Sequence, residues 1–151
     1  MDIILRAATA LLLVGSASAQ TPGPTYAQTL IDTTLVSHPE LTVLALHVTP
    51  PASADNIIIA SNIGHIGKKA DADDLSVLHT GEPRIEMTKT GDISVELVMR
   101  DANGLSIGVV GSTWRLPAGS SNALVLHNAE LMRDEMASKT PSLAALFEPA
   151  R

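Results

Sequence analysis

The second half of the chain consists of three apolar segments separated by short turn sequences, and this pattern limits the possible fold more than any other feature. Residues 92–100 alternate between apolar and polar side chains, which is typical of a strand with one buried face. Residues 101–104 contain an Asn-Gly pair, which favours a tight turn. Strands joined by tight turns pair in antiparallel fashion. We therefore expect residues 84–90, 92–100 and 105–116 to form an antiparallel meander.

The first half of the chain predicts two further strands and two helices. Residues 25–36 place apolar side chains at helical spacing, and Pro39 should end that helix. Residues 41–49 and 57–59 are rich in Val, Leu and Ile, which indicates buried strands. Residues 71–78 indicate a short helix with an acidic first turn.

The last predicted helix begins after Ser120 or Ser121, either of which can cap it, and runs to about residue 138. Its expected apolar side consists of Leu124, Leu131, Met132 and Met136. The predicted fold class is α+β. It is a single antiparallel sheet of about five strands flanked by an N-terminal helix, a short middle helix and a C-terminal helix, with the helices on one side. Gly108 and Gly111, inside the last strand, indicate a bulge or the close approach of another backbone.

The N-terminal segment has the features of a secretory signal peptide. Arg6 supplies a positive charge, residues 7–14 form a short apolar run, and Ala17-Ser18-Ala19 fits a cleavage site. The expected organisation is a signal peptide over 1–19, a flexible lead-in over 20–24, a domain over 25–138 and a tail over 139–151. We expect the mature protein in a bacterial periplasm, because a cysteine-free secreted domain needs no disulfide framework. We expect no membrane insertion after cleavage, because no later segment has the ~20 apolar residues that a membrane span needs.

Composition excludes several functions. The 151 residues include one Trp, one Tyr and one Phe, which leaves no set of aromatic side chains for stacking bases. The formal net charge of −6 disfavours nucleic acid as a partner. The absence of cysteine excludes a thiolate nucleophile and Cys-ligated metal centres. We therefore expect a fold that needs no cofactor or structural metal.

Four segments resemble the extracytoplasmic sensor domains of the PAS and Cache families. These segments are Leu44-Ala45-Leu46-His47, Ile59-Ala60-Ser61-Asn62-Ile63-Gly64, Ile66-Gly67-Lys68-Lys69-Ala70-Asp71 and Asp101-Ala102-Asn103-Gly104-Leu105-Ser106-Ile107-Gly108. The resemblance covers roughly residues 25–138 and is strongest to small secreted proteins with one such domain. It implies a PAS-like or Cache-like fold that binds a small molecule. The chain departs from these sensors because it lacks their usual aromatic pocket and their pattern for recognising amino acids.

The loop of residues 62–69 is the most informative candidate for a binding site. Gly64 and Gly67 would allow backbone N–H groups to converge, and Lys68 and Lys69 add positive charge, so the loop could hold an anion. Asn62 offers both a donor and an acceptor for orienting a ligand. The structural alternative is a glycine-shaped exit from the preceding strand with solvated lysines.

His47 is the second candidate, because it lies in an apolar strand where a buried imidazole needs a partner. The alternative is a core histidine bonded to backbone. The strand from Glu96 to Arg100 would complete the site, so the candidate ligand-binding residues are His47, Asn62, Gly64, Gly67, Lys68, Lys69 and Arg100. A pairing of Glu96 with Glu86 across the hairpin is a further possibility, although we expect both on a solvated face.

The spacing of acidic and histidine residues offers two candidate metal sites, and neither is assigned. The acidic residues among 71–74, together with Glu82, are a candidate calcium site. An acidic helix cap accounts better for the same residues. His127 and Glu130 share a helical face at a spacing that is common by chance.

These observations predict a periplasmic binding or sensor-like module without its own output domain, whose ligand has an anionic group. Its partners would be this small molecule and a membrane receptor or transporter. The alternative is a small periplasmic hydrolase or isomerase that uses His47 as its acid or base. A structural protein with no ligand pocket is the third class. The chain has no Gly-x-Ser-x-Gly nucleophile motif, so no catalytic residue is assigned.

Overall fold

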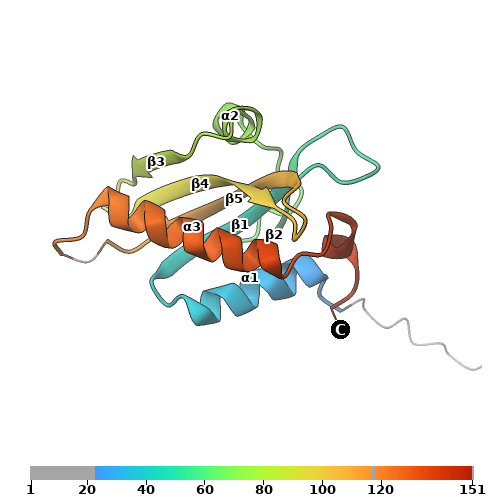
Figure 1. The fold of residues 1–151 in the computed structure, drawn as a ribbon, viewed down its shortest axis with the longest axis horizontal. Helices are drawn as coiled ribbons and strands as arrows, with labels where there is room; N and C mark the ends of the chain where they lie inside the picture. The colour runs from blue at the N-terminus through green and yellow to red at the C-terminus, as the bar shows by residue number, and fades with distance from the viewer. Residues whose placement is uncertain (1–22, 117, 151) are drawn as a thin grey trace, which may run out of the picture.

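The computed structural model describes residues 23–116 and 118–150, which form a sheet between two helical layers (Figure 1). The elements are α1 (Tyr26–Ser37), β1 (Leu41–Val48), β2 (Ile57–Ser61), α2 (Ala72–Thr80), β3 (Arg84–Met87), β4 (Ile93–Arg100), β5 (Ser106–Trp114), α3 (Asn122–Ser138) and the 3-10 helix η1 (Ala144–Phe147). Among the described residues, no helix is long and apolar enough to span a bilayer.

The five strands form one antiparallel sheet in the order β2-β1-β5-β4-β3. The predicted α+β class, the five strands and the meander are therefore confirmed. β3 ends at Met87, three residues earlier than expected, because Thr88 begins the turn: its N–H donates to the carbonyl of Asp92 at 2.8 Å.

Helices α1 and α3 cover one face of the sheet and enclose the main core. Alternate residues of β4 point into this core, as the sequence predicts for Ile93, Val95, Leu97 and Met99. Trp114 is also buried there, and its indole N–H donates to Ser112 Oγ at 2.8 Å, which leaves the polar nitrogen satisfied. Burying one large aliphatic side chain, such as Ile93 or Leu97, contributes about 1.5–3 kcal/mol to the free energy of unfolding. Because most of the buried apolar side chains lie on this face, it supplies most of the stability.

The buried side of α3 differs from the expected one. Leu124 and Leu131 are 50% and 55% exposed, whereas Met132 and Met136 are fully buried. The residues that pack on the sheet recur at intervals of four, three and four along the helix, namely Val125, Ala129, Met132 and Met136. Leu124 and Leu131 were wrongly assigned because they lie one position away from this stripe.

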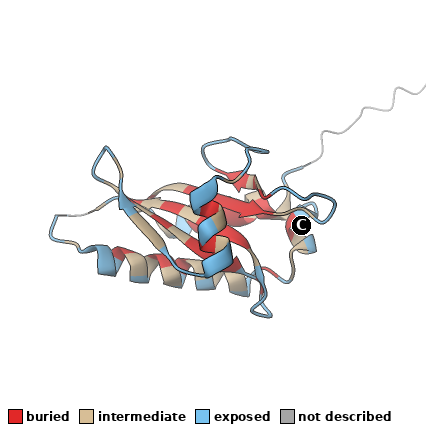
Figure 2. Cartoon of the chain, turned by 90° about the horizontal axis from the view of Figure 1, so that it is seen from above, coloured by how far each residue is buried: buried red, intermediate tan, exposed pale blue. Residues whose placement is uncertain are grey.

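Helix α2 lies on the opposite face of the sheet, so the expectation that all helices share one side is wrong (Figures 1 and 2). Its buried side is narrow: Val77 and Leu78 pack on Val98 and Val109 in a separate small cluster. Both faces of the sheet are apolar at this point, since Val98 and Val109 alternate with residues of the main core. A second helical layer is therefore needed to exclude water from them.

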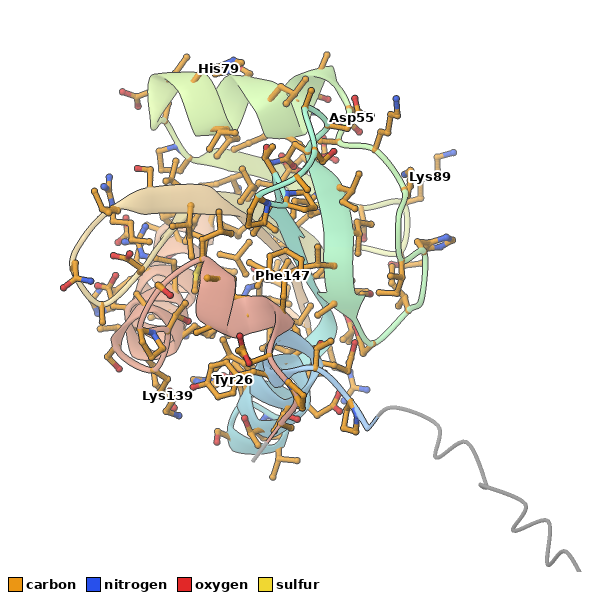
Figure 3. The ribbon with its side chains drawn as sticks, turned by 90° about the vertical axis from the view of Figure 1, so that its right-hand side faces the viewer. Tyr26, Asp55, His79, Lys89, Lys139 and Phe147 are labelled. Atoms are coloured by element: carbon orange, nitrogen blue, oxygen red, sulfur yellow. The ribbon has the colours of Figure 1, made fainter. Side chains whose placement is uncertain are left out.

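The C-terminal segment packs against the start of α1. Leu146 in η1 is fully buried in the main core. The amide of Tyr26 donates to the carbonyl of Glu148 at 2.8 Å, and the amide of Ala150 donates to Pro24 at 2.9 Å. Figure 3 shows η1, with Phe147, above the start of α1, with Tyr26. Residues 139–150, expected as a tail, thus contribute to the core.

The pairing of β1 with β5 depends on Gly108. A Cβ atom added there would lie 2.0 Å from the carbonyl oxygen of His47, so the predicted close approach of another backbone is confirmed. Gly111, three residues along the same strand, has no atom within 4 Å of an added Cβ.

We predict that Gly108→Ala lowers the free energy of unfolding by roughly 1–3 kcal/mol, because β1 must move away from β5. Gly111→Ala is the matched control and should leave this free energy unchanged or slightly raised. Urea denaturation of both variants measures the difference. Equal stability of the two variants would contradict the close contact at Gly108.

Candidate functional site

The strand register arranges the side chains on the sheet face beneath α2 in three rows. One row is apolar, and the other two contain more polar side chains. The apolar row, which α2 covers, ends in a histidine on β1: His47, Val109, Val98. The next row contains small and ionisable residues: Ala45, Gly111, Glu96, Arg84. A third row is half-buried: Val43, Thr113, Ser94. Figure 2 looks onto this face, where α2 crosses the strands and leaves part of the sheet without helical cover.

The first turn of α2 is held above these rows by its own cap. Asp71 Oδ1 accepts hydrogen bonds from the amides of Asp73 and Asp74 at 3.0 and 3.1 Å, and Asp74 Oδ2 accepts from the amide of Asp71 at 3.1 Å. These backbone hydrogen bonds lower the pKa of Asp71. The interpretation of the acidic stretch as a helix cap is therefore confirmed. The cap places the buried side chain of Asp74 toward the sheet.

His47 contacts Asp74 between the helix and the sheet. Its Nδ1 lies 3.4 Å from Asp74 Oδ2, and each side chain is only 10% exposed. Burial lowers the pKa of His47, although the nearby Asp74 and Asp71 carboxyl groups act in the opposite direction. The imidazole is therefore neutral at pH 7. Among the described residues its Nδ1 has no partner with hydrogen-bond geometry.

Glu96 lies in the next row, opposite Arg84 on β3. Burial, followed by repulsion from Asp74, raises its pKa to about 7. Arg84 lowers this pKa by less than burial and Asp74 raise it, and its guanidinium forms salt bridges with Asp73 and Glu86 rather than with Glu96. Glu96 Oε2 is buried and has no hydrogen-bond partner in the described part of the chain. The expectation that Glu86 and Glu96 both lie on a solvated face is wrong for Glu96, because its side chain is half-buried and its Oε2 is buried.

Gly111 leaves open space beside Glu96. It lies between Ala45 and Glu96 in the register, and an added Cβ would meet no atom within 4 Å. We call the set Ala45, His47, Asp74, Glu96 and Gly111 the α2-face site. It combines two buried polar atoms without partners, a pair of small residues beside them, and carboxyl groups from two different elements. A buried polar atom without a partner costs about 1–3 kcal/mol, so these two atoms require an explanation.

The loop of residues 62–69 serves mainly to protect the edge of β2. Asn62 Oδ1 accepts from the amide of Leu44 at 2.9 Å and its Nδ2 donates to Thr42 at 3.0 Å, so its side chain continues the strand pairing. Gly64 and Gly67 adopt positive φ angles of 75° and 86°, which reverse the chain. The loop then returns along β2, where Gly67 N–H donates to the carbonyl of Ile58 at 2.8 Å.

The three cationic residues predicted for the binding site interact with different parts of the protein. Lys69 pairs with Asp55 at 2.9 Å, and Arg100 donates to Gly104 and Ser106 at the β4–β5 turn. Lys68 is exposed, but its charge is close enough to lower the pKa values of His47 and Asp71. Of the three cationic residues selected from the sequence, only Lys68 therefore acts on the pKa of His47.

Three residues of the α2-face site were missed by the sequence as binding residues. Asp74 was assigned only to a cap, Glu96 only as a strand residue at the edge of the expected site, and Gly111 only to a bulge or close approach. One signal in the sequence could have identified Glu96: it is a charged residue between Val95 and Leu97 in a strand that reads as buried. His127 and Glu130 form no group with a third His, Asp or Glu that could hold a metal in the described ranges.

Two surface hollows lie away from the α2-face site. One, of about 350 Å³, lies between α1 and the C-terminal segment and is lined by Tyr26, Thr29, Pro141, Ala145, Glu148, Pro149 and Ala150. The other, of about 250 Å³, lies between β2 and η1 and is mainly apolar. We place the candidate site under α2 instead, because neither hollow is lined by the unpartnered atoms of His47 and Glu96.

No protein-family model and no curated protein matches the chain. Solved structures match it in fold. The second GAF domain of DevS from Mycobacterium smegmatis is 14% identical, with a TM-score of 0.56 over 74% of this chain and 88% of that one. The GAF domain region of a membrane protein from Geobacter sulfurreducens PCA is 11% identical, with a TM-score of 0.53 over 73% and 87%. The type II free methionine-R-sulfoxide reductase from Thermoplasma acidophilum is 11% identical, with a TM-score of 0.52 over 80% and 92%.

The chain therefore has a GAF-like fold, a close structural relative of the PAS and Cache folds that the sequence resembles. The resemblance seen in the sequence was correct at the level of the architecture, and the solved structures that match the chain have the related GAF fold.

We predict that Glu96→Gln stabilises the protein at pH 8 but not at pH 4.5. A carboxyl whose pKa is higher in the folded protein than in the unfolded chain binds its proton more tightly when folded, so stability falls as the pH rises from about 4.5 to about 7. The amide cannot ionise and avoids this loss. Since the side chain is partly exposed, we expect a rise in Tm of about 3 °C at pH 8.

Thermal unfolding of both proteins between pH 4.5 and pH 8 measures this difference. Glu82→Gln is the control, because Glu82 is an exposed carboxyl just before β3 that forms no salt bridge among the described residues, and it should show no such increase. A difference between Glu96→Gln and the wild type that does not change with pH would contradict a raised pKa at Glu96.

Proposed function

We propose that the chain is a small-molecule-binding module whose ligand binds at the α2-face site. The observation that supports this most directly is the pair of buried atoms, His47 Nδ1 and Glu96 Oε2, without partners beside the space at Gly111. Both atoms lie on the sheet face that α2 covers only in part. A bound molecule could satisfy both atoms by hydrogen bonding and could occupy the space that glycine leaves.

This proposal locates the ligand on the sheet rather than in the loop of residues 62–69. The loop's polar groups are largely used within the protein, since Asn62 pairs with β1 and Lys69 pairs with Asp55. Lys68 is the one loop cation that acts on the α2-face site. The anionic ligand expected from the lysines is therefore not part of the proposal.

A catalytic function is the second candidate, and the contact between His47 and Asp74 favours it. A neutral imidazole beside a carboxylate, with a carboxyl of raised pKa in the next row, resembles a general acid–base arrangement. A hydrolase or isomerase would convert its ligand, and His47→Gln would abolish that conversion. A binding module would return its ligand unchanged.

We also propose that the protein acts in a bacterial periplasm after export. The support is the sequence of residues 1–19, which lie outside the described residues. A membrane receptor or transporter is a partner consistent with that location.

We predict that Gly111→Val abolishes ligand binding without destabilising the fold. A valine side chain would fill the space next to Glu96, while valine itself favours strands. The measurement is a thermal-shift screen of the full chain against amino acids, organic acids, amines and sugars. Any compound that raises the Tm of the wild type should fail to raise that of Gly111→Val.

Thr113→Val is the matched control, because it introduces the same residue on the same strand and face, one row away. It should keep every response of the wild type. Responses that persist unchanged in Gly111→Val would place the ligand elsewhere and contradict the α2-face site.

For export, we predict that mass spectrometry of the protein recovered from the periplasm shows a chain beginning at Gln20. Recovery of protein that retains Met1 would contradict cleavage after Ala19.

A further inference from the structure

The charge around the α2-face site is unevenly distributed. Four carboxyl groups lie in this region: Asp71, which caps α2, Asp73 and Asp74 in the first turn of α2, and Glu96 on β4. Two cationic side chains act on the same region, Arg84 from β3 and Lys68 from the loop before α2. Three of the carboxyl groups raise the pKa of Glu96, and only Arg84 lowers it. The site therefore has an excess of negative charge whenever Glu96 is ionised.

One guanidinium is already bound at the exposed side of this region. Arg84 contacts Asp73 on α2 and lies 2.8 Å from Glu86 on its own strand. Its side chain is 37% exposed, so it lies at the rim. Arg84 lies opposite Glu96 in the register, but among the described residues no salt bridge within 4.0 Å joins its guanidinium to the carboxyl group of Asp74 or Glu96. These two carboxyl groups, Glu96 beside Gly111 in the register and Asp74 beside His47, thus form no salt bridge with a lysine or arginine in the described residues.

His47 adds a second argument for the charge of the ligand. Its side chain is nine-tenths buried, its Nδ1 faces Asp74, and burial keeps it neutral. A neutral imidazole can accept a hydrogen bond and does not repel a cation. The neighbouring polar atoms at Glu96 Oε2 and Asp74 Oδ2 are carboxyl oxygens, which accept hydrogen bonds when ionised. A ligand that offers several N–H donors matches this set.

We propose that the α2-face site binds a small organic cation with an amidinium, guanidinium or primary ammonium group, which pairs with Glu96 and Asp74. This inference rests on the proposed function and specifies its ligand. Ala45 and Val43, next to Gly111 and Thr113, would contact the apolar part of such a molecule. Binding releases the proton of Glu96, because the cation pairs with the ionised carboxylate.

The test compares three probes of nearly identical shape: acetamidinium, which is cationic, acetamide, which is neutral, and acetate, which is anionic. Each is titrated at millimolar concentration into the ¹⁵N-labelled full chain at constant ionic strength, and backbone amide shifts are followed by NMR. Acetamidinium should shift the amides of Gly111, Glu96 and Asp74 and bind at pH 8 at least about fivefold more tightly than acetamide. Acetate should not shift these amides.

The pH dependence tests the release of the proton. Between pH 6 and pH 8 the ionised fraction of Glu96 rises about tenfold, so the affinity for acetamidinium should rise about tenfold as well. The α2 carboxyl groups and Arg84 act on Glu96 too. Burial lowers the pKa of His47 in the neighbouring row, which reduces its protonation near pH 6. The Glu96→Gln variant separates the titration of Glu96 from that of the histidine. Glu96→Gln should weaken binding and remove the pH dependence. Glu130→Gln on α3 makes the same chemical change on the other side of the sheet and should alter neither.

If acetamide or acetate binds at Gly111 as tightly as acetamidinium, the proposal of a cationic ligand is wrong. The proposal that the site binds a small molecule would still stand. A pH dependence that survives in Glu96→Gln would overturn the pairing with Glu96. Shifts that are absent for all three probes, or that are the same in Gly111→Val, would overturn the ligand class. The thermal-shift screen then decides separately whether the site binds any molecule.

Discussion

The antiparallel pairing of β1 with β5 is the contact on which the rest of the structure depends. It joins two strands from opposite halves of the domain and connects the β1–β2 hairpin to the β3–β4–β5 meander. Only a glycine at position 108 permits the strands to approach at the carbonyl of His47. The same register places Ala45 beside Gly111, and therefore beside Glu96 on the next strand. Without this pairing the α2-face site would not exist.

The two faces of the sheet have different physical roles. The face covered by α1 and α3 buries a continuous aliphatic core around one tryptophan, and its polar groups are satisfied within the core, as the Trp114–Ser112 hydrogen bond shows. The α2 face has a small apolar cluster and ionisable groups in partly dehydrated positions. Stability therefore comes mainly from one face, and the other can hold groups that would be costly in a core.

The sequence predicted the fold better than the site. Alternation along residues 93–99 and the Asn-Gly turn determine strands and connections locally, so the meander was predictable. The side of the sheet on which α2 packs was not, because a nine-residue helix with two apolar contacts has no strong pattern. Leu124 and Leu131 were misplaced for a related reason, since a shift of one position on a helix exchanges buried for exposed residues.

The candidate site depends on pairings across the sheet, which a single sequence does not reveal. His47 was identified because an imidazole in an apolar strand is conspicuous. Its neighbours Asp74 and Glu96 come from elements 27 and 49 positions further along, and only the register and the α2 cap bring them together. The loop glycines and lysines gave a clear local pattern, but that pattern reflects how β2 ends and how its edge is covered.

The central claim is that the α2-face site holds Glu96 in a dehydrated position next to other carboxyl groups. The most direct measurement is a ¹³C NMR titration of the Glu96 side-chain carboxyl in the folded protein. The structure predicts a pKa of about 7. A midpoint at the ordinary value near 4.5 would show a hydrated, solvent-facing carboxylate and would contradict the account.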